Sequence, residues 1–150
     1  MKPTTHQYTR NMSRLNKKEY YKSIAKAVAE RSTCLRAKVG AIIVKDGVIL
    51  STGYVGSARG EPNCCDVGVC ERMKLGIPPG ERYELCKSVH AEANAIINAA
   101  RSGNSVVDSY MYVYFERIDG GKIKHTGPCL MCARMIKNAG ITQVRVDEIV

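Results

Sequence analysis

The chain has 150 residues, of which 45% are hydrophobic and 25% are charged, and its formal net charge is +9. This length suits one domain, and the composition is that of a globular protein rather than a disordered or fibrous one. No run of about 18 apolar residues marks a membrane span, and the polar, basic segment 1–18 lacks the apolar core of a secretory signal, so we expect a cytoplasmic protein with no membrane partner.

The net charge and the cysteine content indicate which kinds of ligand the chain could bind. The positive surplus arises from 23 Lys and Arg against 14 Asp and Glu. It favours partners that carry phosphate, and it does not choose between small molecules and polyanions. Seven cysteines are present, and in a chain without an export signal clustered cysteines are more often metal ligands than disulfides.

The first half of the chain predicts an arm, a helix and a hairpin. Residues 1–15 carry basic side chains without apolar periodicity, so we expect a flexible basic arm followed by a single domain over residues 16–150. Asn16 and Glu19 form a capping-box pattern that predicts a helix ending near Ser32. Segments 39–45 and 48–54 flank Asp46–Gly47, which predicts a β-hairpin.

The second half alternates helices and strands after a long insertion. Residues 55–87 are rich in Gly, Pro and Cys and predict an irregular segment that needs something to hold it in place. The elements predicted after it are a helix over 91–101, a strand over 110–116, a polar loop over 117–127, a helix over 129–138 closed by Ala139–Gly140, and a strand over 142–146. A hairpin followed by strand–helix units predicts an α/β fold with helices on the faces of a mixed sheet.

Two motifs lie where a loop is predicted to enter a helix. The first is His90–Ala91–Glu92, and the second begins at Pro128 and contains Cys129 and Cys132. Residues two apart within a helix point about 200° apart, so His90 and Glu92 can face one centre only if His90 lies at the cap position. Cys129 and Cys132 are three residues apart and would share one face of a first helical turn.

Together these residues predict a catalytic zinc site. One imidazole and two thiolates select zinc, and three protein ligands leave open the fourth position that a structural site would close. The positive ends of both helices favour thiolate over thiol. Glu92 would then move protons between water, a ring nitrogen and departing ammonia. Taken singly, His90 could be a buried structural histidine and the cysteines a fragment of a four-cysteine site, but the combined pattern is the signature of zinc nucleobase deaminases.

A wider set of segments carries a family resemblance. The segments are residues 31–36, 39–44, 53–57, 76–86, 90–97 and 135–141. Through them the chain, from about Ala29 to Val146, resembles the deoxycytidylate (dCMP) deaminases of the cytidine deaminase superfamily. The resemblance implies a three-layer α/β/α cytidine deaminase-like fold with a mixed sheet, assembled as a homohexamer. It also implies hydrolysis of dCMP to dUMP and ammonia, which supplies thymidylate synthesis in pyrimidine nucleotide metabolism.

The resemblance assigns roles by position. It places zinc on His90, Cys129 and Cys132 and acid–base catalysis on Glu92. The backbone around Ala91 and the turn at Thr126 and Gly127 would hold the base. Members of this family are commonly activated by dCTP and inhibited by dTTP, and the segment that corresponds to their nucleotide-contacting loop contains Gly53, Tyr54, Gly56 and Ser57.

The insertion distinguishes this family from its nearest rival and suggests a second metal. The tRNA adenosine deaminases share both motifs but reach the His-Ala-Glu helix through a short loop. Some dCMP deaminases carry a structural zinc, which would add folding energy directly. A second site here could use Cys34, Cys64 or Cys65, Cys70 and Cys86, with Cys64 preferred by its position; the alternative is that these are unpaired thiols.

Three departures from the family pattern keep alternatives open. Val55 replaces an asparagine in the nucleotide-contacting loop, Tyr114 replaces a strand threonine, and the loop 117–127 is longer than usual. Tyr114 could be ordinary strand packing or could stack on the base. The departures leave another cytosine nucleotide, such as a modified base or a triphosphate, as an alternative substrate. An RNA or single-stranded DNA deaminase and a non-catalytic zinc scaffold are further alternatives, and nucleic acid is the less favoured partner.

Overall fold

The structure is a computed structural model that describes residues 13–122 and 127–148. Its main elements are α1 (Lys17–Ala29), β1 (Ala37–Lys45), β2 (Val48–Tyr54), α4 (Ala91–Arg101), β5 (Tyr110–Arg117), α5 (Leu130–Asn138) and β6 (Gln143–Glu148). In the described part of the chain, no helix combines the length and the apolar character needed to cross a membrane. Most of the predicted basic arm, residues 1–12, lies outside the described residues.

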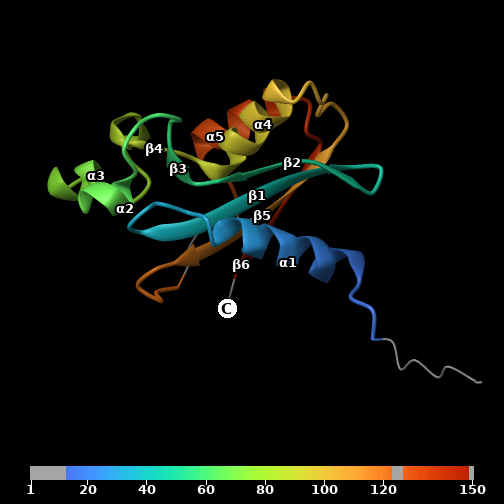
Figure 1. Ribbon diagram of the computed structural model, residues 1–150, viewed down its shortest axis with the longest axis horizontal. Coiled ribbons are helices and arrows are strands. Elements are labelled where there is room, and N and C mark those ends of the chain that lie inside the picture. Colours follow the sequence, from blue (N-terminus) through green and yellow to red (C-terminus); the bar gives the residue numbers. More distant parts are fainter. Residues whose placement is uncertain (1–12, 123–126, 149–150) are drawn as a thin grey trace, which may run out of the picture.

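A four-stranded mixed sheet forms the middle layer. Its strand order is β2-β1-β5-β6; β1 pairs antiparallel with β2 and with β5, and β5 pairs parallel with β6. Helix α1 covers one face, and α4 and α5 cover the other (Figure 1). This arrangement confirms the predicted three-layer α/β/α fold with a mixed sheet.

The start of α1 and the hairpin follow the sequence prediction. Asn16 is the N-cap of α1, and its Oδ1 accepts a hydrogen bond from the backbone N–H of Glu19 at 2.9 Å. The helix ends at Ala29 rather than near Ser32. Asp46 and Gly47 have φ angles of 50° and 77°, as the tight turn between two twisted strands requires.

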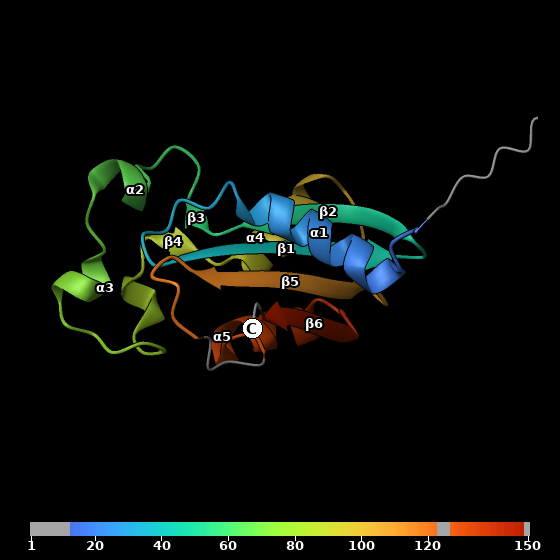
Figure 2. The same ribbon diagram turned by 90° about the horizontal axis from the view of Figure 1, so that it is seen from below.

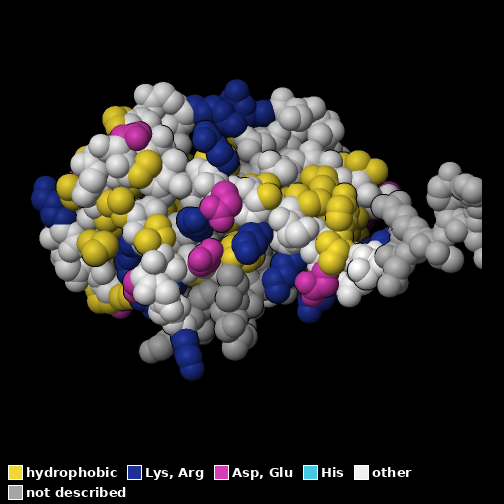
Figure 3. Space-filling model, turned by 60° about the horizontal axis from the view of Figure 1, so that its bottom comes forward, with side chains coloured by type: hydrophobic (Ala, Val, Ile, Leu, Met, Phe, Trp, Pro, Cys, Tyr) yellow, Lys and Arg dark blue, Asp and Glu magenta, His cyan; other side chains and the backbone are white. Residues whose placement is uncertain are grey.

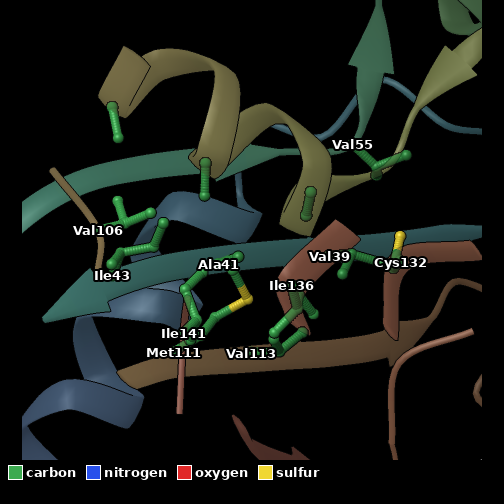
Figure 4. Close-up of a cluster of buried hydrophobic side chains, with 13 residues drawn as sticks. Val39, Ala41, Ile43, Val55, Val106, Met111, Val113, Cys132, Ile136 and Ile141 are labelled. Atoms are coloured by element: carbon green, nitrogen blue, oxygen red, sulfur yellow. The ribbon is translucent and has the colours of Figure 1, made fainter. Parts of the chain in front are cut away.

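Alternating side chains of β1 and β5 build two apolar layers. The layer under α4 and α5 includes Val39, Ala41, Ile43, Met111, Val113 and Cys132 (Figure 4). The layer under α1 includes Tyr21, Ile42, Val44, Tyr112 and Tyr114. Tyr114 is fully buried, and its hydroxyl donates to Glu116 at 3.2 Å. Because Tyr114 faces α1 while Cys132 lies in the opposite layer, the residue is strand packing and the base-stacking alternative is wrong.

The insertion over residues 55–87 is more ordered than its composition predicts. The elements in and just after it are β3 (Gly56–Ser57), α2 (Cys64–Val67), α3 (Glu71–Lys74), the 3₁₀ helix η1 (Tyr83–Leu85) and β4 (Ser88–Val89). They lie together at one end of the sheet (Figure 2). The backbone N–H of Cys65 donates to the carbonyl of Thr33 at 3.1 Å, and β3 pairs with β4. Hydrogen bonds within the protein therefore hold the insertion against the segment that joins α1 to β1.

Helix α4 lies directly on the edge strand β2. Side-chain amides reach from α4 and the residues after it to carbonyls of β2, in the pairs Asn94–Tyr54 and Asn98–Thr52, both at 2.8 Å, and Asn104–Leu50 at 3.0 Å. A Cβ atom at Gly53 would lie 2.3 Å from the backbone nitrogen of Ala95 and 2.5 Å from the carbonyl oxygen of Ala91. Only glycine allows this approach.

We therefore expect Gly53→Ala to lower the free energy of unfolding by about 1–3 kcal/mol, because the added methyl group must push the α4 backbone away from the sheet. Urea titration followed by circular dichroism measures the change. Gly127→Ala is the matched control, since within residues 13–122 and 127–148 nothing lies within 4 Å of a Cβ at that position. Equal unfolding midpoints for the wild type and Gly53→Ala would contradict the close approach.

Candidate active site

Two helix starts meet at the candidate site. His90 is the N-cap of α4, with extended backbone angles of φ −65° and ψ 151°, which confirms that it lies at the cap position. Cys129 is the N-cap of α5, with φ −61° and ψ 161°. The predicted start of this helix at Cys129 was therefore one residue early, because Cys129 precedes the first turn instead of belonging to it.

The three predicted zinc ligands have the spacing that a metal requires. Nδ1 of His90 lies 3.5 Å from the sulfur of Cys129 and 3.4 Å from the sulfur of Cys132. Tetrahedral zinc with ordinary Zn–N and Zn–S bond lengths would separate such donors by about 3.6 Å. Within the described residues, this is the one group of at least three His, Cys, Asp or Glu side chains whose ligand atoms all lie within 4.8 Å of one another. The donor set and its geometry fit zinc.

The hydrogen bond between Cys129 and Cys132 shifts the pKa values of the two thiols in opposite directions. A hydrogen bond from Cys132, helped by His90, lowers the pKa of Cys129 to about 4 against the opposing effect of burial. The same hydrogen bond raises the pKa of Cys132. The backbone N–H of Cys132 also donates to the sulfur of Cys129 at 3.4 Å. The hydrogen bonds from the Cys132 thiol, from His90 and from the Cys132 backbone thus stabilise a thiolate at Cys129, the form of cysteine that binds metals.

Glu92 lies in the first turn of α4 with a side chain buried beside these ligands. The residue is 7% exposed. Burial raises the pKa of its carboxyl group, although its own backbone N–H and the charge of His90 act in the opposite direction. A carboxyl group with a raised pKa can both accept and return a proton near neutral pH, as general acid–base catalysis requires.

Tyr83 and Arg72 from the insertion extend the site. The Tyr83 ring meets the imidazole of His90 edge to face, with ring centroids 4.8 Å apart and planes at 85°. Arg72 lies over the Tyr83 ring, with Cζ 4.6 Å from the centroid. Sequence reasoning assigned no role to either residue, because no local spacing links an aromatic residue in an irregular loop to a zinc ligand. The only signal was that Tyr83 lies in a segment that carries the family resemblance.

The residues predicted to hold the base are only partly described. Ala91 is fully buried at the start of α4, and Gly127 is exposed just before Pro128. Thr126 lies outside the described residues. Their contact with a base stays a prediction.

The cysteines predicted for a second metal are not drawn together. Cys34, Cys70 and Cys86 are half-buried, Cys64 is buried and Cys65 is exposed. The sulfur of Cys64 lies 3.6 Å from the hydroxyl of Ser88. Among the described residues, no three of these sulfurs come within ligand distance of one another.

The predicted effector segment has structural tasks in this protein. Gly53 packs against α4, and the carbonyl of Tyr54 accepts the amide of Asn94. Gly56 and Ser57 form β3, and in the described part of the chain the buried hydroxyl of Ser57 has no hydrogen-bond partner. Nucleotide binding by this segment stays a prediction.

Comparisons of the sequence and the structure with known proteins identify the family of this chain. Residues 15–148 match the model of the cytidine and deoxycytidylate deaminase zinc-binding region. The chain is 36% identical over 138 residues to the deoxycytidylate deaminase of Mycobacterium phage D29, covering 89% of this chain and 95% of that protein. It is 33% identical to the deoxycytidylate deaminase of Enterobacteria phage T4, covering 81% and 72%. It spans only 35% of the Schizosaccharomyces pombe deoxycytidylate deaminase, at 32% identity.

A solved structure supports the same relationship. The dCMP deaminase from cyanophage S-TIM5, in complex with dCMP and dUMP, superposes with a TM-score of 0.64 at 31% identity, covering 89% of this chain and 83% of that one. The family match includes His90, Glu92, Cys129 and Cys132, the four residues that converge in the structure. The chain belongs to the cytidine and deoxycytidylate deaminase family.

Proposed function

We propose that this protein hydrolyses dCMP to dUMP and ammonia with the aid of one zinc ion. The observation that carries the proposal is the convergence of Nδ1 of His90 with the sulfurs of Cys129 and Cys132 at 3.4–3.5 Å, next to the buried carboxyl group of Glu92. The choice of dCMP rests on the relatives, which are named deoxycytidylate deaminases, and on the cyanophage structure that contains dCMP and dUMP.

His90, Cys129 and Cys132 would hold the zinc, which would act as a Lewis acid and lower the pKa of a water molecule to about 7. Glu92 accepts the proton of the attacking water and passes it to N3 of the cytosine ring. As the C4–N bond breaks, Glu92 takes the second proton of the former water from the oxygen on C4 and transfers it to the departing amine, which leaves as ammonia. One water is consumed, and the exocyclic amine is replaced by the carbonyl oxygen of uracil.

This mechanism predicts a specific defect in Glu92→Gln. The variant keeps the size of the buried side chain and one acceptor oxygen but cannot shuttle protons, so turnover of dCMP should fall by about 10²–10⁴-fold while zinc stays bound. Ammonia release and metal analysis of the same preparation measure the two quantities.

His90→Ala is the matched control, because it removes a ligand and should lose both zinc and turnover. A Glu92→Gln enzyme that deaminates dCMP at the wild-type rate would remove Glu92 from the mechanism.

One other class of substrate, a polynucleotide, competes with dCMP. A net charge of +9 favours polyanions as well as nucleotides, so an RNA or single-stranded DNA deaminase is the second candidate. On the face drawn in Figure 3, however, Lys and Arg side chains are spread over the surface and several lie beside Asp or Glu. A nucleic-acid groove would gather them along one path, so the charge pattern of this face favours a small nucleotide over a polynucleotide.

A substrate panel separates these possibilities. We expect zinc-loaded protein to deaminate dCMP faster than CMP, dCTP, deoxycytidine, base-modified dCMP or a cytosine-containing oligonucleotide. Each reaction is run alone and with dCTP or dTTP, which also tests the predicted activation and inhibition. Preference for another cytosine nucleotide would replace dCMP, and turnover of the oligonucleotide with salt-sensitive binding would establish the polynucleotide alternative. Zinc-loaded protein inert towards every compound would favour the non-catalytic scaffold.

A second, structural zinc is a separate proposal. Burial raises the pKa of Cys86, and the nearby sulfurs of Cys34 and Cys64 add to that effect. Three of the predicted ligands thus lie in one region, although among the described residues no three of the sulfurs come within ligand distance. The proposal predicts two zinc ions per chain and the loss of one in Cys86→Ser, with the deaminating site still loaded. One zinc per chain, unchanged in Cys86→Ser, would show that these cysteines are free thiols.

The assembly and the location stay predictions. A groove of about 310 Å³ lies between α4 and α5, and its lining is mostly apolar: Ala93, Ile96, Ile97, Met135, Asn138 and Ala139. Such a surface supports self-association, which would bury it; the number of six subunits rests on the family resemblance alone. The cytoplasmic location, the single domain over residues 16–150 and the flexible arm likewise rest on sequence reasoning.

A further inference from the structure

The His90 ring is held in an orientation that points Nδ1 at the two sulfurs, and some contact must fix that orientation. A histidine that binds a metal through one ring nitrogen is commonly oriented by a hydrogen bond at the other, to a carboxylate, a carbonyl or water. In the residues that the structure describes, both hydrogen-bonding contacts of the His90 ring are made by Nδ1, with the sulfurs of Cys129 and Cys132. Among the described residues, the plane of the His90 ring is therefore held by packing against neighbouring side chains.

Tyr83 supplies that packing. Its ring lies 4.8 Å from the imidazole, centroid to centroid, and the two planes are nearly perpendicular at 85°. Edge-to-face contact is a preferred geometry of aromatic pairs, and it constrains the tilt of one ring against the other. A turn of the His90 ring about its own bond would break this contact and move Nδ1 away from the sulfurs.

Arg72 in turn holds Tyr83. Arg72 is 5% exposed although its side chain is charged. Its Nε donates to the carbonyl of Glu81 and its Nη2 to the carbonyl of Pro78, both at 3.0 Å. These bonds fix the guanidinium plane and the chain just before η1, and Cζ lies 4.6 Å from the Tyr83 centroid. Planar, two-pronged donation of this kind is available to arginine and not to lysine.

We propose that Tyr83 is a positioning residue for the metal ligand His90, and that Arg72 positions Tyr83. The insertion over residues 55–87 thereby completes the metal site from outside the two helices that carry the ligands. The inference rests on the proposed zinc site. It requires the flat ring of Tyr83 and not its hydroxyl group.

The test compares side chains that share either the ring or only the bulk. Zinc-loaded Tyr83→Leu should release zinc to an excess of chelator about 10–100-fold faster than the wild type, and its cobalt-substituted form should have an altered visible absorption spectrum. Tyr83→Phe should match the wild type in both measurements. Arg72→Lys should accelerate release, and Tyr83→Leu combined with Arg72→Lys should be no faster than Tyr83→Leu alone, because both changes act through one contact.

Tyr20→Leu is the control, since Tyr20 is 48% exposed and packs against Tyr21 on α1, on the other face of the sheet. It should leave zinc release unchanged. A Tyr83→Leu protein with wild-type zinc release and an unaltered cobalt spectrum would overturn the inference, even if its thermal midpoint fell. If the wild type itself bound no zinc through His90, both the proposed function and this inference would fail. If the wild type bound zinc and the Tyr83 variants released it at the same rate, only this inference would fail and the proposed function would stand.

Discussion

The contact between α4 and the edge strand β2 is the constraint on which the site depends. His90 and Glu92 belong to the start of α4, so a shift of this helix along the sheet would carry them away from Cys129 and Cys132. Four residues of helix rise about 6 Å and two residues of strand advance about 6.6 Å. The amides of Asn94 and Asn98 can therefore meet alternate carbonyls of β2, and Gly53 removes the bulk that would hold the backbones apart.

The metal ligands benefit from lying just outside their helices. As N-caps, His90 and Cys129 have extended backbones, which lets the two side chains turn towards a common centre. The positive ends of α4 and α5 then face the thiolates and the Glu92 carboxyl group, and such ends stabilise negative charge. Burial opposes ionisation of Glu92 while the helix start assists it, and this balance suits a group that must gain and lose a proton in every turnover.

Patterns within a few residues predicted most of the framework. The N-cap Asn16, the Asp46–Gly47 turn and the cap position of His90 all follow from local spacing, and the structure confirms them. What local spacing could not predict are contacts between distant segments. The meeting of Tyr83 with His90 depends on how the insertion folds back.

Some errors have equally physical origins. Cys129 belonged to a helical pattern, yet a residue at a helix boundary satisfies that pattern whether it is the cap or the first residue of the turn. From the sequence, Tyr114 is an open choice between strand packing and base stacking and not an error, because both faces of its strand are apolar and the sequence cannot tell which face it occupies. The short elements within residues 55–87 depend on contacts such as those of Arg72, which composition does not reveal.

The asparagine side chains that bind the carbonyls of β2 have a consequence beyond catalysis. An edge strand normally presents a row of unpaired carbonyls that can recruit a strand from another molecule and begin aggregation. Here the carbonyls of Leu50, Thr52 and Tyr54 already accept side-chain amides from the helical layer. The helix that carries the catalytic residues, together with the residues just after it, thus also occupies carbonyls that strand addition at this border of the sheet would need.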